Sequence, residues 1–221
     1  MDKKYVTTGK PAIGGAVWVG DVDATLPEDA VTAIDETDFT DLGYCSEDGL
    51  KEQGEITTEN IKEWGGQIVD SDETEKKDKY QVTLIESTNP AVLKLVHGDE
   101  NVTGDLENGI TVKANAKAHQ LKSFIVDMLL KGAVKRVVLP CAKVTAIAEV
   151  VYKRGQAVGY QVTLTAYPNA DGDTHYEYIK ATATATAAAE SGSSGGSGGE
   201  SSGGSSGGSG GESSGGSGGE G

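Results

Sequence analysis

The stretch from Ser123 to Tyr167 constrains the fold of this chain more than any other. Apolar residues stand at every second position on either side of the tetrapeptide Lys153–Gln156, namely Val144, Ala146, Ala148, Val150 and Tyr152, then Val158, Tyr160, Val162, Leu164 and Ala166. This alternation predicts two β-strands that share one buried face and are joined as a hairpin. We expect Val150, Val162 and Leu164 to face one interior.

Two more strands are predicted directly before this hairpin. Apolar runs from Phe124 to Leu130 and from Val134 to Leu139 flank the turn dipeptide Lys131-Gly132, and Pro140 should end the second run because proline cannot donate to a ladder. Four consecutive antiparallel strands make half of a sandwich or barrel. The predicted fold class is therefore mainly β, an antiparallel β-sandwich or barrel.

One short helix is predicted to flank the sheet. Asn89 can cap its start, Pro90 takes the first helical position and Gly98 ends it. Its apolar residues lie about one turn apart, so the helix should seal one side of the sheet core.

Other predicted strands are shorter or less regular. We expect a strand pair over Pro11–Gly20 with Trp18 in the core, and strands over Tyr80–Glu86, Ile110–Ala118 and Tyr176–Ile179. The charged segment Asp70–Lys79 is predicted to be a mobile loop. Between these lies an extended stretch, Glu52–Val69, whose polar and apolar residues do not sort onto two faces. Contact of part of that stretch with another subunit would explain the mixed pattern.

The end of the chain has a composition that predicts disorder. Residues 191–221 are Ser, Gly and Glu only, and such a segment cannot bury enough surface to fold. We therefore divide the chain into a β domain, residues 1–190, and a disordered C-terminal tail, residues 191–221.

The net charge of −15 is unevenly distributed. Asp21–Glu63 holds 14 acidic residues against Lys51 and Lys62, whereas Lys113–Arg154 holds 9 basic residues against two acidic ones. An acidic patch of this kind could meet the basic patch of another copy.

No group of residues in the sequence has the spacing of a catalytic or metal site. The histidines, His97, His119 and His175, are far apart, and neither Asp21-Val-Asp23 nor Asn169–Asp173 completes a ligand set. We expect no enzyme activity and no cofactor. The start of the chain lacks the apolar region of a signal peptide and no apolar run is long enough to span a membrane, so we expect a cytoplasmic protein with reduced Cys45 and Cys141 and no membrane insertion.

Several segments, in their order along the chain, resemble the major tail protein, or tail tube protein, of bacteriophages with long non-contractile tails. These are Leu42–Gly49 leading into Ile61–Gly66, the helix Asn89–Gly98, and Lys135–Pro140 followed by Val158–Pro168. The resemblance covers roughly residues 13–179. It implies a protein of the virion tail, assembled in the host cytoplasm as rings of six that stack into a tube. It also implies a tape measure protein in the lumen, tail terminator and tail-tip proteins as partners, and DNA that passes through without specific binding.

The resemblance gives the mixed stretch and the charge partition a common explanation. We expect a subunit interface at Glu55, Glu59, Ile61 and Trp64, together with Lys135 and Arg136, with the acidic segment of one subunit facing the basic segment of a neighbour. The alternative is a non-catalytic carbohydrate-binding or protein-binding β-sandwich module with a flexible linker. That module should show a cluster of exposed aromatic residues, and eight Tyr and two Trp scattered along the chain predict no such cluster.

Overall fold

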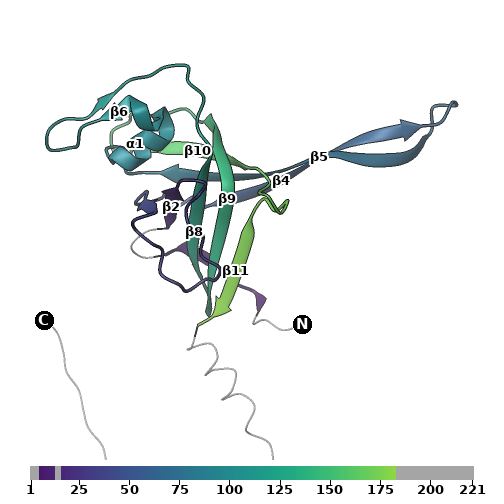
Figure 1. Cartoon of the computed structure of the whole chain (residues 1–221), viewed down its shortest axis with the longest axis horizontal. Helices are drawn as coiled ribbons and strands as arrows, with labels where there is room; N and C mark the ends of the chain where they lie inside the picture. Colours follow the sequence, from purple (N-terminus) through teal and green to yellow (C-terminus); the bar gives the residue numbers. More distant parts are fainter. Residues whose placement is uncertain (1–4, 13–15, 183–221) are drawn as a thin grey trace, which may run out of the picture.

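The computed structural model describes residues 5–12 and 16–182, so the tail and the proposed boundary at residue 190 lie outside the described residues. Figure 1 shows a β-rich body with a long hairpin projecting from it. The elements are, in chain order, β1 (Gly9–Pro11), β2 (Val17–Gly20), β3 (Phe39–Asp41), β4 (Lys51–Lys62), β5 (Ile68–Leu84), α1 (Pro90–His97), η2 (Asp99–Asn101), β6 (Val102–Thr103), β7 (Thr111–Val112), β8 (Lys122–Leu130), β9 (Ala133–Ile147), β10 (Tyr160–Ala166) and β11 (Tyr176–Ala181).

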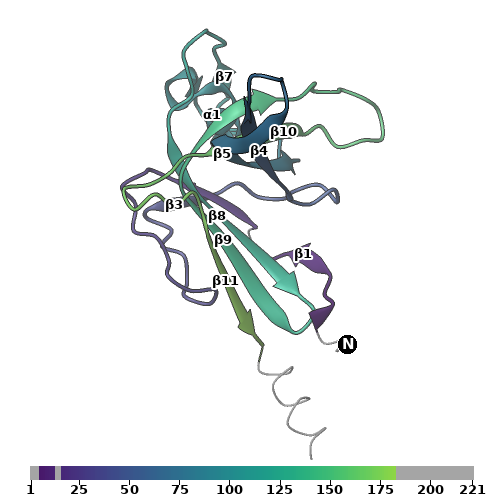
Figure 2. The same ribbon diagram turned by 90° about the vertical axis from the view of Figure 1, so that its right-hand side faces the viewer.

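Most of the strands belong to one antiparallel sheet. Its main path runs β3-β2-β8-β9-β10-β5-β4, with β1 added beside β8 and β11 beside β9, while β6 and β7 form a separate small pair. In Figures 1 and 2, β8, β9 and β11 run down through the body while β4, β5 and β10 cross it near the top. The sheet therefore bends, and the predicted mainly antiparallel β class is confirmed.

The long strand β9 joins the two parts of this sheet. Its residues Ala133–Val138 pair with β11 and its residues Ala142–Ile147 pair with β10. The prediction that Pro140 ends a strand is wrong, because Pro140 lies in the gap between these two partners, where no donor is required. The ladder to β8 also shifts register there, and the Ser123 hydroxyl donates to the Pro140 carbonyl oxygen at 2.7 Å. The two strands predicted on either side of Pro140 are thus one strand with an irregularity.

The predicted pairing of the next two strands is confirmed, with a longer connection. β9 ends at Ile147 and β10 begins at Tyr160, so residues 148–159 form the loop in place of the predicted tetrapeptide turn. Val162 and Leu164 are 0% and 1% exposed, and the half-buried Val150 packs against the same cluster. These three residues face one interior, as predicted.

The helix α1 also matches its prediction in detail. The Asn89 side chain accepts a hydrogen bond from the Ala91 N–H at 2.9 Å, and Pro90 starts the helix. Gly98 ends it with a φ of 97°, which favours glycine, and donates to the Lys94 carbonyl oxygen at 2.7 Å. The apolar face of α1 closes the main core, whose members include Tyr80, Val82, Leu84, Val92, Leu93, Phe124, Val137 and Leu139.

The centre of the sheet is buried on its other face too. Ile125 and Val138 form a second cluster with Phe39, and the half-buried Trp18 packs against it. Residues 21–38 connect β2 to β3 and contribute Ala24, Leu26 and Ile34 to this cluster. Because β8 and β9 are covered on both sides here, their sequences are continuously apolar, without alternation.

The remaining predicted strands can be compared with the strand pairing in the structure. A strand pair was predicted over Pro11–Gly20. β2 lies within this range, β1 overlaps it only at Pro11, and both strands pair with β8 and not with each other. The predicted strand Ile110–Ala118 is wrong beyond Thr111–Val112, since its alanine side chains are exposed and only the two-residue β6 pairs with it. The predicted last strand occurs as β11. Within the described residues, no helix is long and apolar enough to cross a membrane.

Candidate subunit interface

The projecting hairpin consists of β4, β5 and the turn between them. The two strands pair from Lys51 opposite Gln81 to Lys62 opposite Ile68. The Glu63 carboxylate accepts hydrogen bonds from the backbone N–H groups of Gly65 and Gln67, at 2.8 and 3.2 Å, which fixes the turn and lowers the pKa of that carboxyl. The predicted mobile loop Asp70–Lys79 is therefore wrong, because this segment is the outer part of β5. Its charges are compatible with a strand since both faces meet solvent.

Burial changes abruptly along this hairpin. From Tyr80 onward β5 alternates between buried and half-buried residues, whereas its residues Ile68–Lys76 are all exposed. The paired part of β4 is exposed over almost its whole length. The outer hairpin is consequently a two-stranded ribbon that this subunit does not cover, and two strands alone are only marginally stable in water.

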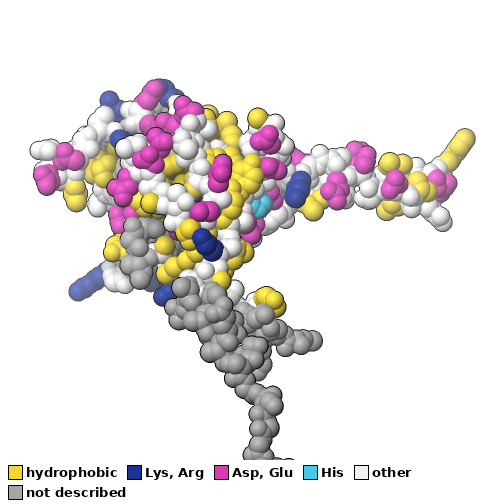
Figure 3. Space-filling view, turned by 60° about the horizontal axis from the view of Figure 1, so that its bottom comes forward, with side chains coloured by type: hydrophobic (Ala, Val, Ile, Leu, Met, Phe, Trp, Pro, Cys, Tyr) yellow, Lys and Arg dark blue, Asp and Glu magenta, His cyan; other side chains and the backbone are white. Residues whose placement is uncertain are grey.

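Large apolar side chains are exposed on this ribbon. Trp64, in the turn, is 103% exposed, and four more residues are about half exposed, namely Ile56, Ile61, Ile68 and Val69. Figure 3 shows hydrophobic and acidic side chains interleaved along the hairpin, with a basic side chain near its root. Apolar side chains gathered on an otherwise unsupported ribbon indicate a contact surface.

Four of the six predicted interface residues lie together on this hairpin. Glu55, Glu59 and Ile61 are in β4 and Trp64 is in the turn, so the structure groups them as the sequence analysis does. Glu55 forms an ion pair with Lys79 across the hairpin at 2.7 Å. The sequence analysis did not include Ile56 and Ile68 among the predicted interface residues. Both lie within Glu52–Val69, the stretch whose mixed polar and apolar pattern indicated a contact with another subunit.

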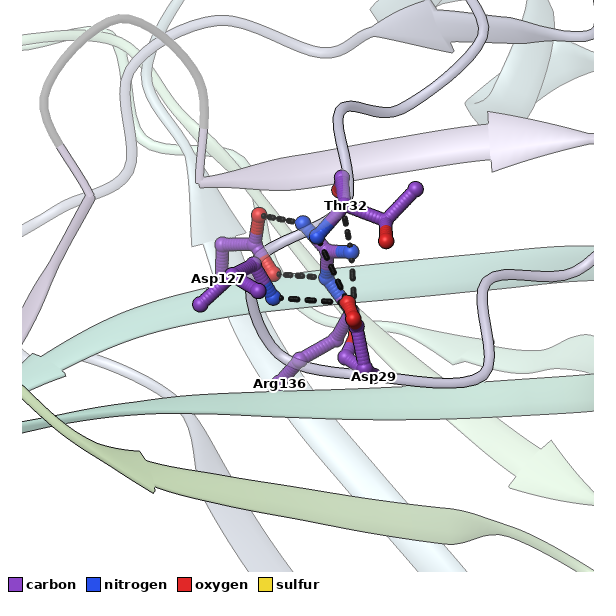
Figure 4. Close-up of polar contacts among 5 residues, drawn as sticks. Asp29, Thr32, Asp127 and Arg136 are labelled. Atoms are coloured by element: carbon purple, nitrogen blue, oxygen red, sulfur yellow. Dashed lines mark hydrogen bonds and ion pairs between the residues drawn. The ribbon is translucent and has the colours of Figure 1, made fainter.

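The other two predicted interface residues lie on β9, away from the hairpin, and one of them needs correction. Arg136 is 4% exposed. Its guanidinium donates two hydrogen bonds to the Asp127 carboxylate, from Nε at 2.6 Å and from Nη2 at 2.7 Å. Its Nη1 donates to the backbone carbonyl oxygens of Asp29 and Thr32 (Figure 4). Arg136 is enclosed by its own subunit because it anchors the acidic loop 21–38 to the sheet. It has no surface to offer to a neighbour.

Lys135 points to the opposite face of β9 and is largely covered. Its ammonium forms an ion pair with Glu177 on β11. Elsewhere Lys122 forms ion pairs with Asp21 at 2.8 Å and with Asp99 at 2.7 Å. The basic segment Lys113–Arg154 therefore meets part of the acidic segment Asp21–Glu63 within one subunit, which satisfies part of the charge partition internally.

A groove of about 730 Å³ lies between α1, the segment before β8 and the end of β2. His97 and His119 are among its lining residues, and burial, followed by Lys143 and His97, lowers the pKa of His119. The lysines Lys117 and Lys122 in its wall are paired, with Glu100 and with the two aspartates named above. This groove shows no pairing of a nucleophile with a base among the described residues.

The sheet also ends in strands with unpaired edges. β4 and β3 lie at the two ends of the main path, and β11 pairs only with β9 among the described residues. Unpaired N–H and C=O groups along such an edge are available to a strand of another chain.

A family model described as "Phage tail tube protein" matches residues 6–190. The chain belongs to the phage tail tube protein family. It is therefore a structural protein of the virion tail, and the predicted resemblance to tail tube proteins is confirmed. The match favours this assignment over the alternative of a binding module with a linker.

Among solved structures, this chain is similar to the one described as "Cryo-EM structure of the anti-feeding prophage cap (AFP tube terminating cap)". The identity is 10%, the TM-score is 0.36, and the alignment covers 78% of this chain and 93% of that chain. No curated protein matches the chain.

Proposed function

We propose that this tail tube protein polymerises with copies of itself into rings, of six subunits each, that stack to form the tube of a phage tail. The observation that carries the proposal is the outer β4–β5 hairpin. It forms a two-stranded ribbon on which the side chain of Trp64 is fully exposed and that of Ile61 is about half exposed. A neighbouring subunit would cover these side chains and supply the packing that the hairpin lacks.

The size of the expected gain can be stated for Trp64. A buried Trp side chain removes about 200 Å² from water. At about 25 cal/mol per Å² this burial contributes about 5 kcal/mol per contact, part of which offsets the cost of association. Aromatic anchors of this kind commonly dominate an interface.

Free strand edges would provide the second type of contact. Pairing between the exposed edges of neighbouring subunits would continue the sheet around the ring and remove the edges. The net charge of −15 supports a tube wall that does not hold DNA, because carboxylates repel phosphates, whereas lysines bind them with release of counterions. We infer that DNA passes through the tube without specific binding.

The remaining partners follow from the same proposal. A tape measure protein would occupy the lumen during assembly in the host cytoplasm, and tail terminator and tail-tip proteins would contact the end rings. The β domain would extend to residue 190, with residues 191–221 as a tail outside the assembly.

The proposal is tested by shortening the hairpin. Gly54 lies opposite Asp78, so replacing residues 55–77 by Asn-Gly closes the strands with a two-residue turn and leaves the buried part of β5 intact. We expect the shortened chain to give a circular dichroism spectrum that is still that of a β protein and to remain monomeric, while the full chain forms rings or rods in negative-stain electron micrographs.

A point variant and a matched control refine this test. Trp64→Ser should raise the protein concentration needed for polymerisation by at least about tenfold. Tyr44→Ser removes another exposed aromatic residue, outside the hairpin, and should have a smaller effect. Rods formed by the hairpin-shortened chain at the normal concentration would refute the assignment of the hairpin as the interface.

A further inference from the structure

Three metal-ligating side chains meet where the hairpin joins the body. Glu52 lies on β4, His175 directly precedes β11, and Glu177 is on β11. One ligand atom from each residue lies within 4.8 Å of the other two. The sequence gives no sign of this group, because Glu52 is more than a hundred residues away from His175 and Glu177 and only the folded sheet brings it to them.

The two nitrogen atoms of His175 face different surroundings. Nδ1 lies 3.5 Å from Asp78 Oδ2 and 3.3 Å from the Thr174 hydroxyl oxygen. The Thr174 hydroxyl already donates to Asp78 Oδ2 at 2.5 Å, so both oxygen atoms near Nδ1 act as acceptors. When Nε2 binds a metal ion, Nδ1 carries the ring proton and can donate it to one of these oxygens. A carboxylate behind a histidine in this way is the usual support of a metal-binding histidine.

The opposite nitrogen lies near the carboxylate of Glu52. Nε2 of His175 is 3.9 Å from Glu52 Oε1. A divalent cation between these two atoms would be attracted by the carboxylate and could accept the nitrogen lone pair. Glu177 adds a second carboxylate from the same side of the strand, since residues 175 and 177 are two apart.

The carboxylates around the site carry more negative charge than the neighbouring lysines and arginines balance. The Asp78 side chain is buried, with 7% of the residue exposed. Among the described residues, Lys135 is the only lysine or arginine that forms an ion pair with Glu52, Asp78 or Glu177, and its partner is Glu177. The neighbouring Tyr80 hydroxyl donates a hydrogen bond to Glu52 Oε1 at 3.4 Å. A divalent ion would balance the excess of negative charge.

We propose that Glu52, His175 and Glu177 bind a divalent transition-metal ion of the zinc type at the root of the hairpin, with Asp78 orienting the histidine. Zinc accepts one nitrogen and two carboxylate oxygens at about 2.0 to 2.2 Å, with the fourth position open to water. The two glutamates are exposed, so they can close the remaining distance by rotation of their side chains. Glu177 has one oxygen for Lys135 and a second for the metal.

The bound ion ties β4 to β11, two strands that do not pair with each other. Its effect is to hold the root of the projecting hairpin against the body. This role is independent of what the outer hairpin contacts, so the proposed function and the metal site can fail separately.

The test is calorimetric titration of the chelator-treated full chain with zinc chloride at pH 7.5. We expect one ion per chain, and a cobalt(II) derivative whose visible absorption bands show nitrogen and oxygen ligands at four or five positions. His175→Ala and Glu52→Gln should each weaken zinc binding at least about tenfold, the usual consequence of losing one ligand contact. Circular dichroism spectra verify that both variants fold, and Glu52→Gln preserves the size of an exposed side chain.

His119→Ala is the matched control, since it removes a half-buried histidine far from the cluster in sequence. It should bind zinc as the unaltered chain does. Equal binding by His175→Ala would overturn the proposal and indicate adventitious surface binding. Absence of zinc binding by the unaltered chain would overturn it as well.

Discussion

Replacing Arg136 by methionine should lower the free energy of unfolding far more than the same replacement at its neighbour Lys135. Both residues are basic and adjacent on β9, but they face opposite sides of the sheet. The Arg136 side chain is 5% exposed and its partner Asp127 is 21% exposed, so Arg136→Met leaves a carboxylate that is desolvated and unpaired. Removing one partner of such a pair typically costs about 3 to 5 kcal/mol.

The two loop carbonyl groups that Arg136 also binds add little to this cost. Asp29 and Thr32 lie on the exposed loop 21–38, so their carbonyl groups can turn to water when the guanidinium is lost. Lys135 forms a partly exposed ion pair with Glu177, and Lys135→Met should cost about 0 to 1 kcal/mol. The predicted difference between the two variants is therefore about 2 to 5 kcal/mol.

Thermal and urea unfolding of purified subunits measure this difference. For a domain of this size about 1 kcal/mol shifts the melting temperature by about 2 to 4 °C, so Arg136→Met should melt at least about 4 °C below Lys135→Met. Combining Arg136→Met with Asp127→Asn should recover part of the loss, because no unpaired charge remains. Equal melting temperatures for the two single variants would refute the reasoning that the Arg136 pair is buried and anchors the loop.

Three further predictions concern the core, the tail and the charges. Leu164→Ala should cost about 2 to 5 kcal/mol of unfolding free energy and Thr163→Ala clearly less, and equal costs in urea unfolding would mean that the faces of β10 are misassigned. A chain ending at Glu190 should form the same tubes by electron microscopy, and a truncated chain that stays monomeric would make the tail an assembly element. Reversing Lys153 and Arg154 to Glu should slow polymerisation measured by light scattering, as should added salt, because both residues are exposed and screening acts beyond about 10 Å at 0.1 M salt. An unchanged rate in low salt would exclude this loop from the interface.

Local rules predicted those elements whose determinants lie close together in sequence. The helix α1 follows from Asn89, Pro90 and Gly98, which act within one or two turns. The pairing of β8 with β9 follows from apolar runs and the turn Lys131-Gly132. These predictions needed no knowledge of distant neighbours.

Elements that depend on distant partners were predicted poorly. A proline ends a strand only where a neighbouring strand requires a backbone N–H at that position. At Pro140 no such N–H is required, because β9 pairs with β11 before this residue and with β10 after it. The alternation from Ile110 to Ala118 gives a strand only where a partner exists, and β6 offers two residues. Neither fact can be read from the local sequence.

The candidate interface was predicted in part for the same reason. The mixed stretch Glu52–Val69 drew attention to Ile61 and Trp64, which are exposed on the outer hairpin, because such a pattern can be read from the local sequence. Whether a charged residue is exposed is not local. Lys135 and Arg136 differ in their surroundings because Asp127 and loop 21–38 cover only one face of β9.

The order of strands in the sheet has a consequence for synthesis on the ribosome. The hairpin of β4 and β5 can form as soon as its own residues emerge, but the buried half of β5 pairs with β10, roughly 80 residues later. At about 5 to 20 residues per second, β5 waits about 4 to 16 s for this partner. During that interval the edge of β5 that later pairs with β10 is unpaired at Tyr80, Val82 and Leu84. The nascent chain thus presents its projecting ribbon before the body that will carry it exists, and subunits become competent to join others only when their last third has been made.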